Sequence, residues 1–214
     1  QPNLSQQATR RLTRPCARDL AASAPLCGMR AFGALALLLA VCASEPPAPS
    51  ELEWAFLNAC ADGDYALVEK MVDAGFDVDS ATPDGESALH LAGIGGSAAV
   101  VELLAARGAR LDRRATSPRG LAMTPLAWLV YGLHVDATAA LVSAGAAVNV
   151  VVRKETGALI TALDIALGIT GGPAEADAES ISKILRNAGA KTYDDLTPFE
   201  KTHFAPPPRP SGEL

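Results

Sequence analysis

Apolar residues recur with helical spacing in four stretches between about residue 51 and residue 191. Each stretch holds an amphipathic run, such as Val100-Val101-Glu102-Leu103-Leu104, that glycine follows within a few residues. Glycine in that position ends a helix, because it reaches positive φ without a clash of a Cβ atom. The pattern predicts four helices that stop at Gly75, Gly108, Gly145 and Gly189.

A second set of helix starts lies upstream of these glycines, at Ser87, Thr124 and Thr161, spaced 37 residues apart. Serine and threonine supply the oxygen of a helix N-cap, and Pro125 suits the first helical position. The distance from start to glycine is 21, 21 and 28 residues, and counting 21 back from Gly75 reaches another amphipathic stretch. The intervals predict four copies of a helix–turn–helix unit, joined by hairpin-like segments.

These units resemble the ankyrin repeat family, whose repeats begin with a Thr-Pro-Leu-His helix start and end in a Gly-Ala-Asp-Val-Asn turn. Matching segments here include Thr124-Pro125-Leu126-Ala127 and Gly145-Ala146-Ala147-Val148-Asn149. The resemblance covers roughly 140 residues and implies an all-α, ankyrin-type α-solenoid of helix-turn-helix repeats with hairpin-like loops. Only His90 keeps the family's histidine, whereas Leu57, Ala127 and Asp164 stand at the matching positions, which weakens the expected hydrogen bonds between repeats.

The segments outside the repeats divide the chain further. We expect an extension of doubtful status at 1–28, a predicted signal peptide at 29–43, a Pro-rich linker at 44–50 and the ankyrin repeat domain, with about four repeats, at 51–192. A short C-terminal cap at 193–204 and a Pro-rich tail at 205–214 complete the chain. Thr197-Pro198-Phe199-Glu200 has the spacing of a capping box, which predicts a short closing helix. The last repeat also carries an extra acidic loop at 171–177.

Residues 29–43 have the layout of a secretory signal peptide. Met29 and Arg30 precede an apolar run at 31–41 that is too short to cross a bilayer, which needs roughly 20 residues. Small residues favour cleavage before Ser44, and we rank this above a lipid anchor at Cys42. The expected location is secreted or periplasmic, with a cytoplasmic protein as the alternative. If residues 1–28 belong to the protein, their arginines favour an organelle transit peptide instead.

Composition and charge narrow the class of protein. Hydrophobic residues make up 49% and charged residues 20%, which is typical of a globular domain. The net charge is −6, and residues 51–204 hold 12 basic against 21 acidic residues, which argues against nucleic-acid binding. The four cysteines show no spacing typical of a metal site, and we expect the one inside the repeats, Cys60, to be a buried, inert thiol.

An enzyme is the least expected class. The three histidines at 90, 134 and 203 accompany no nucleophile motif, and the family uses His90 structurally. Gly93-Ile94-Gly95-Gly96 lacks the Lys-Ser/Thr of a phosphate loop, and Glu175, Asp177 and Glu179 lack the pattern of a calcium loop. We therefore expect no catalytic residue, no cofactor and no metal.

Binding of a protein partner is the expected function. The family's architecture places Ile94, Tyr131 and Ile169 on the exposed side of the first helices, as an apolar stripe that suits a binding hot spot. The alternative is that these side chains fold against their neighbours, as we expect for Trp128, which should face the core.

The hairpin tips carry five basic residues that would form a local positive patch: Arg113, Arg114, Arg119, Arg153 and Lys154. Such a patch would steer an acidic partner, although a merely solvated loop is equally compatible. We expect a monomeric, exported protein–protein interaction module, with an intracellular scaffold or inhibitor as the alternative.

Overall fold

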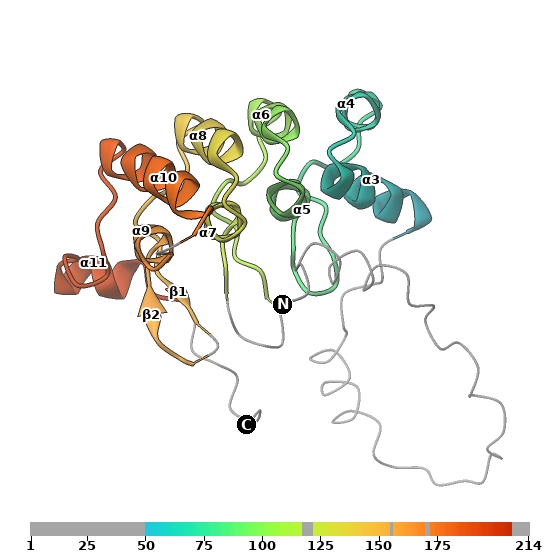
Figure 1. The fold of residues 1–214 in the computed structure, drawn as a ribbon. Helices are drawn as coiled ribbons and strands as arrows, with labels where there is room; N and C mark the ends of the chain where they lie inside the picture. The colour runs from blue at the N-terminus through green and yellow to red at the C-terminus, as the bar shows by residue number, and fades with distance from the viewer. Residues whose placement is uncertain (1–49, 117–121, 155, 170–171, 207–214) are drawn as a thin grey trace, which may run out of the picture. The chain divides into compact units, whose positions relative to one another are not determined.

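The computed structural model describes residues 50–116, 122–154, 156–169 and 172–206. Within them the helices come in consecutive pairs: α3 (Glu51–Asp62) with α4 (Tyr65–Asp73), α5 (Ala88–Gly95) with α6 (Ala98–Ala106), α7 (Pro125–Tyr131) with α8 (Val135–Ser143), and α9 (Ala162–Leu167) with α10 (Glu175–Asn187). The first helices form an inner row and the second helices an outer row (Figure 1). Among the described residues, no helix is long and apolar enough to cross a membrane. The predicted all-α solenoid of helix–turn–helix units is confirmed.

Three connections, which we call the fingers, join one pair to the next: the first at 76–87, the second at 109–124 and the third at 146–161, and their described parts, which leave out 117–121 and 155, are mostly extended. The first finger contains an antiparallel bridge between Ala81 and Ser87. The third contains two short antiparallel strands, β1 (Val152–Arg153) and β2 (Leu159–Ile160). All three extend from the inner row, on the side away from the outer helices (Figure 1).

Local signals set the ends of the helices. Thr124 accepts a hydrogen bond from the backbone of Ala127, and Pro125 occupies the first position of α7, as predicted. The four glycines predicted to end the second helices have φ between 83° and 96°, which confirms the left-handed stop. A capping box of Thr197 and Glu200 opens α11 (Pro198–His203), the predicted closing helix.

The core follows the stack as a thin layer between the two rows. Each helix packs against its pair partner and against the equivalent helix of the next pair. Mostly aliphatic side chains fill the layer. The largest fully buried residues include the aromatic Phe56 and the aliphatic Leu89, Leu104, Leu141 and Ile181. Burial raises the pKa of Cys60 to about 12, so this thiol stays protonated and inert, as predicted.

One polar position of each finger holds the next repeat in place. Asp79 accepts the backbone N–H of Arg110 at 2.9 Å, and Asp112 accepts that of Ala147 at 2.8 Å. Asn149 accepts the N–H of Lys191 at 2.8 Å. We call Asp79, Asp112 and Asn149 the finger ladder, since each oxygen satisfies a backbone donor one repeat further along.

The predicted acidic loop of the last repeat is wrong in part. Helix α10 begins at Glu175, so Glu175, Asp177 and Glu179 lie on a helix. Carboxylates are favourable near the positive end of a helix, and Glu179 forms an ion pair at 2.8 Å with Lys183 one turn later.

Two left-handed glycines meet different surroundings, which allows a matched test of the stack. A Cβ atom at Gly108 would meet no described heavy atom within 4 Å, whereas one at Gly96 would run into the ring of His134 in the next repeat. We expect Gly108→Ala to lower the free energy of unfolding by about 1 kcal/mol, the cost of left-handed backbone alone. Gly96→Ala should cost clearly more, since the stacked turns must also separate. Urea midpoints of the two variants measure the difference, and equal midpoints would contradict the close packing at His134.

Candidate partner-binding surface

Tyr131 is the most exposed large side chain at the predicted stripe. It ends α7, in the middle of the inner row, and 51% of its surface is exposed. The ring of Trp128 contacts it edge to face, with centroids 6.3 Å apart and planes at 86°. Trp128 itself is half-buried against the core. The neighbouring indole therefore supports the ring of Tyr131 and leaves much of it open to a partner.

The other two predicted stripe residues are less exposed. Ile94, in α5, and Ile169, just after α9, are both half-buried, and Ile94 packs against the core. Leu167 is 40% exposed and escaped prediction. Helix α9 has only six residues and ends at Leu167, so the side chain of its last residue is left uncovered. Since α7 and α9 pack side by side, the exposed side chains of Tyr131 and Leu167 belong to neighbouring inner helices, and a continuous apolar stripe stays a prediction.

A strained residue follows Tyr131. Leu133 has φ of 60°, in a turn where the two preceding repeats place the glycines Gly63 and Gly96 at φ of 73° and 70°. A leucine in this conformation costs about 1–2 kcal/mol relative to glycine. Its half-buried side chain packs against the core, which offsets part of that cost.

The arginines of the second finger make hydrogen bonds within the fold. Arg113 donates to the carbonyl of Asp79 at 2.8 Å. Arg114 donates to the carbonyls of Ala122, Val151 and Phe204 at 3.1, 2.7 and 2.7 Å. Both side chains are half-buried, so these guanidinium groups hold backbone segments together. A role for them in partner binding stays a prediction.

The remaining predicted cations belong to the tips of two fingers. Arg153 ends β1 and is half-buried, and the exposed Lys154 closes the turn of the third finger through its backbone, which donates to Ala158. Arg119 lies outside the described residues. Arg153 and Lys154 are neighbours on the third finger, and the predicted basic patch stays a prediction.

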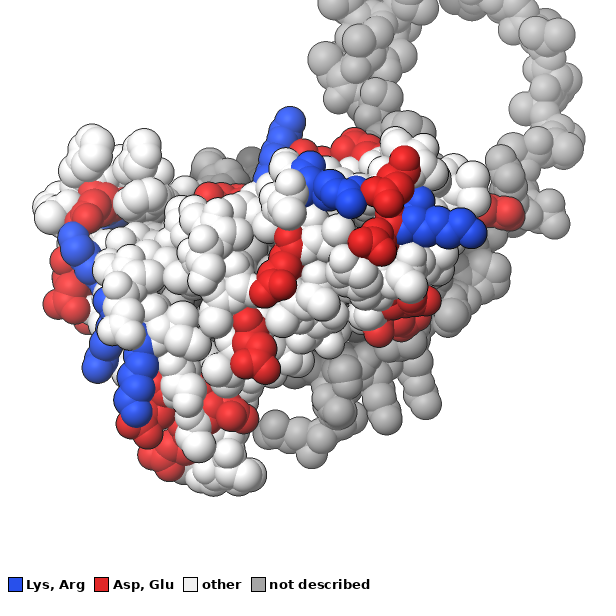
Figure 2. Space-filling model, turned by 90° about the horizontal axis from the view of Figure 1, so that it is seen from above, with Lys and Arg blue, Asp and Glu red and all other residues white. Residues whose placement is uncertain are grey.

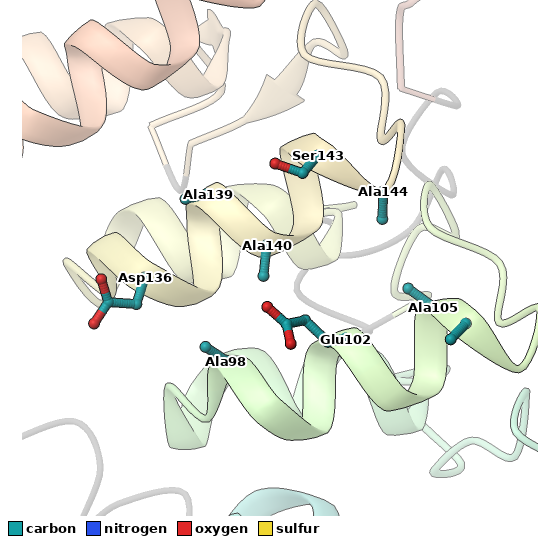
Figure 3. Close-up of a pocket in the computed structure, with 9 residues that line it drawn as sticks. Ala98, Glu102, Ala105, Asp136, Ala139, Ala140, Ser143 and Ala144 are labelled. Carbon is teal, nitrogen blue, oxygen red and sulfur yellow. The ribbon is translucent and has the colours of Figure 1, made fainter.

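The outer row presents a different face. Seen from above, it is largely uncharged, with acidic side chains along its middle and both acidic and basic ones toward its ends (Figure 2). A shallow groove separates α6 from α8 and is lined mainly by alanines, with Glu102 extending into it and Asp136 at one end (Figure 3). Alanines with two separated carboxylates offer no convergent set of polar groups, so this groove is a weak candidate for a ligand site.

His90 is structural, as predicted. Its Nδ1 accepts the backbone N–H of Ser87 at 3.1 Å, so Nε2 carries the proton and donates to the carbonyl of Met123, in the next repeat, at 3.1 Å. The side chain is fully buried, and this burial lowers its pKa to about 4. At the matching position of the last repeat, Asp164 accepts the backbone N–H of Tyr193, which lies beyond the repeats, at 2.8 Å.

Metal-binding and family comparisons complete the description of the site. Within residues 50–116, 122–154, 156–169 and 172–206, no group of three His, Cys, Asp or Glu side chains could hold a metal ion. A family model described as ankyrin repeats (3 copies) matches residues 56–164. A search of curated proteins found no match to the chain.

The buried imidazole makes stability depend on pH. The unfolded chain takes up a proton at His90 near pH 6.5, but the folded chain does so only near pH 4. The contribution of neutral His90 to the free energy of unfolding is therefore complete above pH 6.5. This contribution, on the order of 3 kcal/mol, is lost as the pH falls toward 4. In urea unfolding at several pH values, His90→Gln should lose less stability than wild type across this window. Equal losses in both proteins would show that His90 does not carry the dependence.

Proposed function

The chain belongs to the ankyrin repeat family, and from this premise we propose that it is a non-enzymatic module that binds a protein partner across its inner helices and fingers. Ankyrin repeats are generally protein–protein interaction modules, and a solenoid offers such a partner a continuous surface. The module acts as a monomer in this proposal. Its partner is defined by the surface, because the fold itself implies no particular target.

Tyr131 is the observation that carries the proposal. Aromatic side chains at the centre of an interface contribute most of the binding energy in many complexes, since they bury a large area with few rotatable bonds. The contact with Trp128 limits the movement of the Tyr131 ring, so less conformational entropy is lost on binding. Leu167, also exposed, extends the apolar surface along the inner row.

Charge supplies the second element of the proposed interface. Arg153 and Lys154 stand on the third finger of a domain that is acidic overall, and Arg119 belongs to the second. A partner with an acidic patch would be attracted toward these fingers and repelled elsewhere, which raises the association rate at low salt. Arg113 and Arg114 are half-buried and donate to backbone carbonyls, so their charge adds less to the attraction of such a partner.

Export is part of the proposal. It rests on the signal-peptide layout of residues 29–43, which lie outside the described residues. A lipid anchor at Cys42 would hold the module at a membrane, and cleavage before Ser44 would release it. An intracellular scaffold or inhibitor is the alternative if this segment is retained.

A pair of tyrosine variants tests the binding surface. Tyr65, on α4 of the outer row, is 41% exposed and serves as the control for Tyr131. We expect proteins crosslinked to the wild-type module in its native host to be recovered with Tyr65→Ala and lost with Tyr131→Ala. A purified partner should bind Tyr131→Ala at least about tenfold more weakly, the usual effect at a hot spot. If both variants retain the same crosslinked proteins with equal affinity, the interface lies elsewhere.

The proposed export is tested by the intact mass of the mature protein, expressed from Met29 in its native host and fractionated by compartment. We expect a mass that begins at Ser44, in the secreted or periplasmic fraction. A lipid-modified mass that begins at Cys42 would place the module on a membrane instead. A mass that still includes residues 31–41 would overturn export and favour the intracellular scaffold.

A further inference from the structure

The C-terminal end of the repeat domain returns to the fingers. We call residues 193–206 the strap; it contains α11 and lies on the side of the helix rows toward which the fingers extend (Figure 1). The carbonyl of Phe204 accepts two hydrogen bonds, from Arg114 Nη2 at 2.7 Å and from the backbone N–H of Val151 at 3.2 Å. Two donors on two different fingers thus converge on one backbone oxygen of the strap.

Arg114 also makes hydrogen bonds that do not involve the strap. Its Nη1 donates to the carbonyls of Ala122 and Val151, which ties the second finger to the third. Burial lowers the pKa of this guanidinium, which nevertheless stays charged at neutral pH. If the strap leaves, Nη2 loses the acceptor that Phe204 provides and remains a half-buried charged donor, which is costly unless another acceptor takes its place.

The strap is buried at Leu196, which is 3% exposed, and at Pro206, but the helix between them is attached weakly. None of the six described residues of α11 is buried, and Phe199 is 76% exposed. Polar contacts hold the near end: the N–H of Tyr193 donates to Asp164, and Lys191, just before the strap, pairs with Glu200 at 2.7 Å. Segments with few buried apolar contacts open at a lower free energy than the core, so the strap is the part of the domain best suited to open alone.

We propose that the strap is a displaceable internal ligand, and that Arg114 and Val151 form a docking site for the backbone carbonyl of an extended peptide segment, which the chain's own Phe204 occupies. Val151 directly precedes β1, which pairs with β2 on the third finger, so the site lies where that finger meets the strap. The docking site goes beyond the proposed function. It rests on that function in one respect, namely that an extended segment of the partner displaces the strap.

Hydrogen exchange of the full chain tests whether the strap opens alone. The N–H of Val151 donates to Phe204, so its exchange rate reports the opening of the strap. We expect the backbone amides of Val151 and of the last turn of α11 to exchange at one common rate, and this rate to be faster than that of the amides in α6 and α8. Arg114→Met keeps the side-chain stem but removes the donors and should raise this rate at least about tenfold, the effect of losing one charge-assisted hydrogen bond.

Arg110→Met is the matched control on the same finger. The Arg110 guanidinium pairs with Asp79 at 3.3 Å and is largely exposed, so its loss should leave the exchange of Val151 unchanged. The proposal is overturned if Val151 exchanges only as slowly as the amides of α8, or if Arg114→Met exchanges at the wild-type rate.

A peptide supplied in trans tests the docking site itself. The probe is a fluorescein-labelled synthetic peptide of residues 196–206 with an amidated end, added to the full chain. Glu200→Gln removes the ion pair with Lys191 but keeps an oxygen for the helix cap, so it loosens the strap far from Arg114. We expect this variant to bind the peptide more tightly than wild type, by the same factor as its Val151 exchange increases, since affinity scales with the open fraction.

Arg114→Met separates an open strap from an intact docking site. Its strap is loosened too, yet we expect it to bind the peptide at least about tenfold more weakly than Glu200→Gln, because one of the two donors is gone. Equal binding to both variants, or equal binding to wild type and Glu200→Gln despite faster exchange, would overturn the docking site. No partner protein is needed, so failure here is distinguishable from failure of the proposed function.

Discussion

Hydrogen bonds from the finger ladder to the following repeat are the interaction on which the rest of this structure depends. One helix pair cannot bury its apolar face alone, so each pair is stable only when the next lies at the correct height and angle. Asp79, Asp112 and Asn149 set that placement, since each accepts a backbone N–H of the following repeat at 2.8 to 2.9 Å. The thin aliphatic core, the two helix rows and the exposed inner surface all follow from stacking in this register.

Contacts between repeats tolerate a change of chemistry when the geometry is kept. His90 donates from Nε2 to a carbonyl of the next repeat, whereas Asp164, at the same position two repeats later, accepts an N–H from Tyr193. The bond runs in the opposite direction, but it still links the start of one helix pair to the segment that follows the stack. A repeat motif that scores residue types alone therefore misses the bond at Asp164, which joins the last repeat to the strap.

The parts of the fold that depend on neighbouring residues were predictable from the sequence. Helix stops such as Gly108 and caps such as Thr124 act within a few residues, so spacing alone located them. The exposure of Leu167 was missed, because it follows from the shortness of α9, and the role of Arg114 was missed, because its acceptor Phe204 lies 90 residues away. Of the candidate surface, Tyr131 could be identified by its repeat position, while the degree of burial of Ile94 depends on core packing.

Arg114 shows why a count of charges along a loop does not give the charge of a surface. A guanidinium group offers five donors in a plane, and when backbone carbonyls surround it the side chain works as a cross-link and is withdrawn from solvent. The second finger therefore contributes less positive surface than its four arginines suggest, and the third finger becomes its structural partner through Val151. The same withdrawal leaves a half-buried charged group that links two fingers to the strap through the carbonyls of Ala122, Val151 and Phe204.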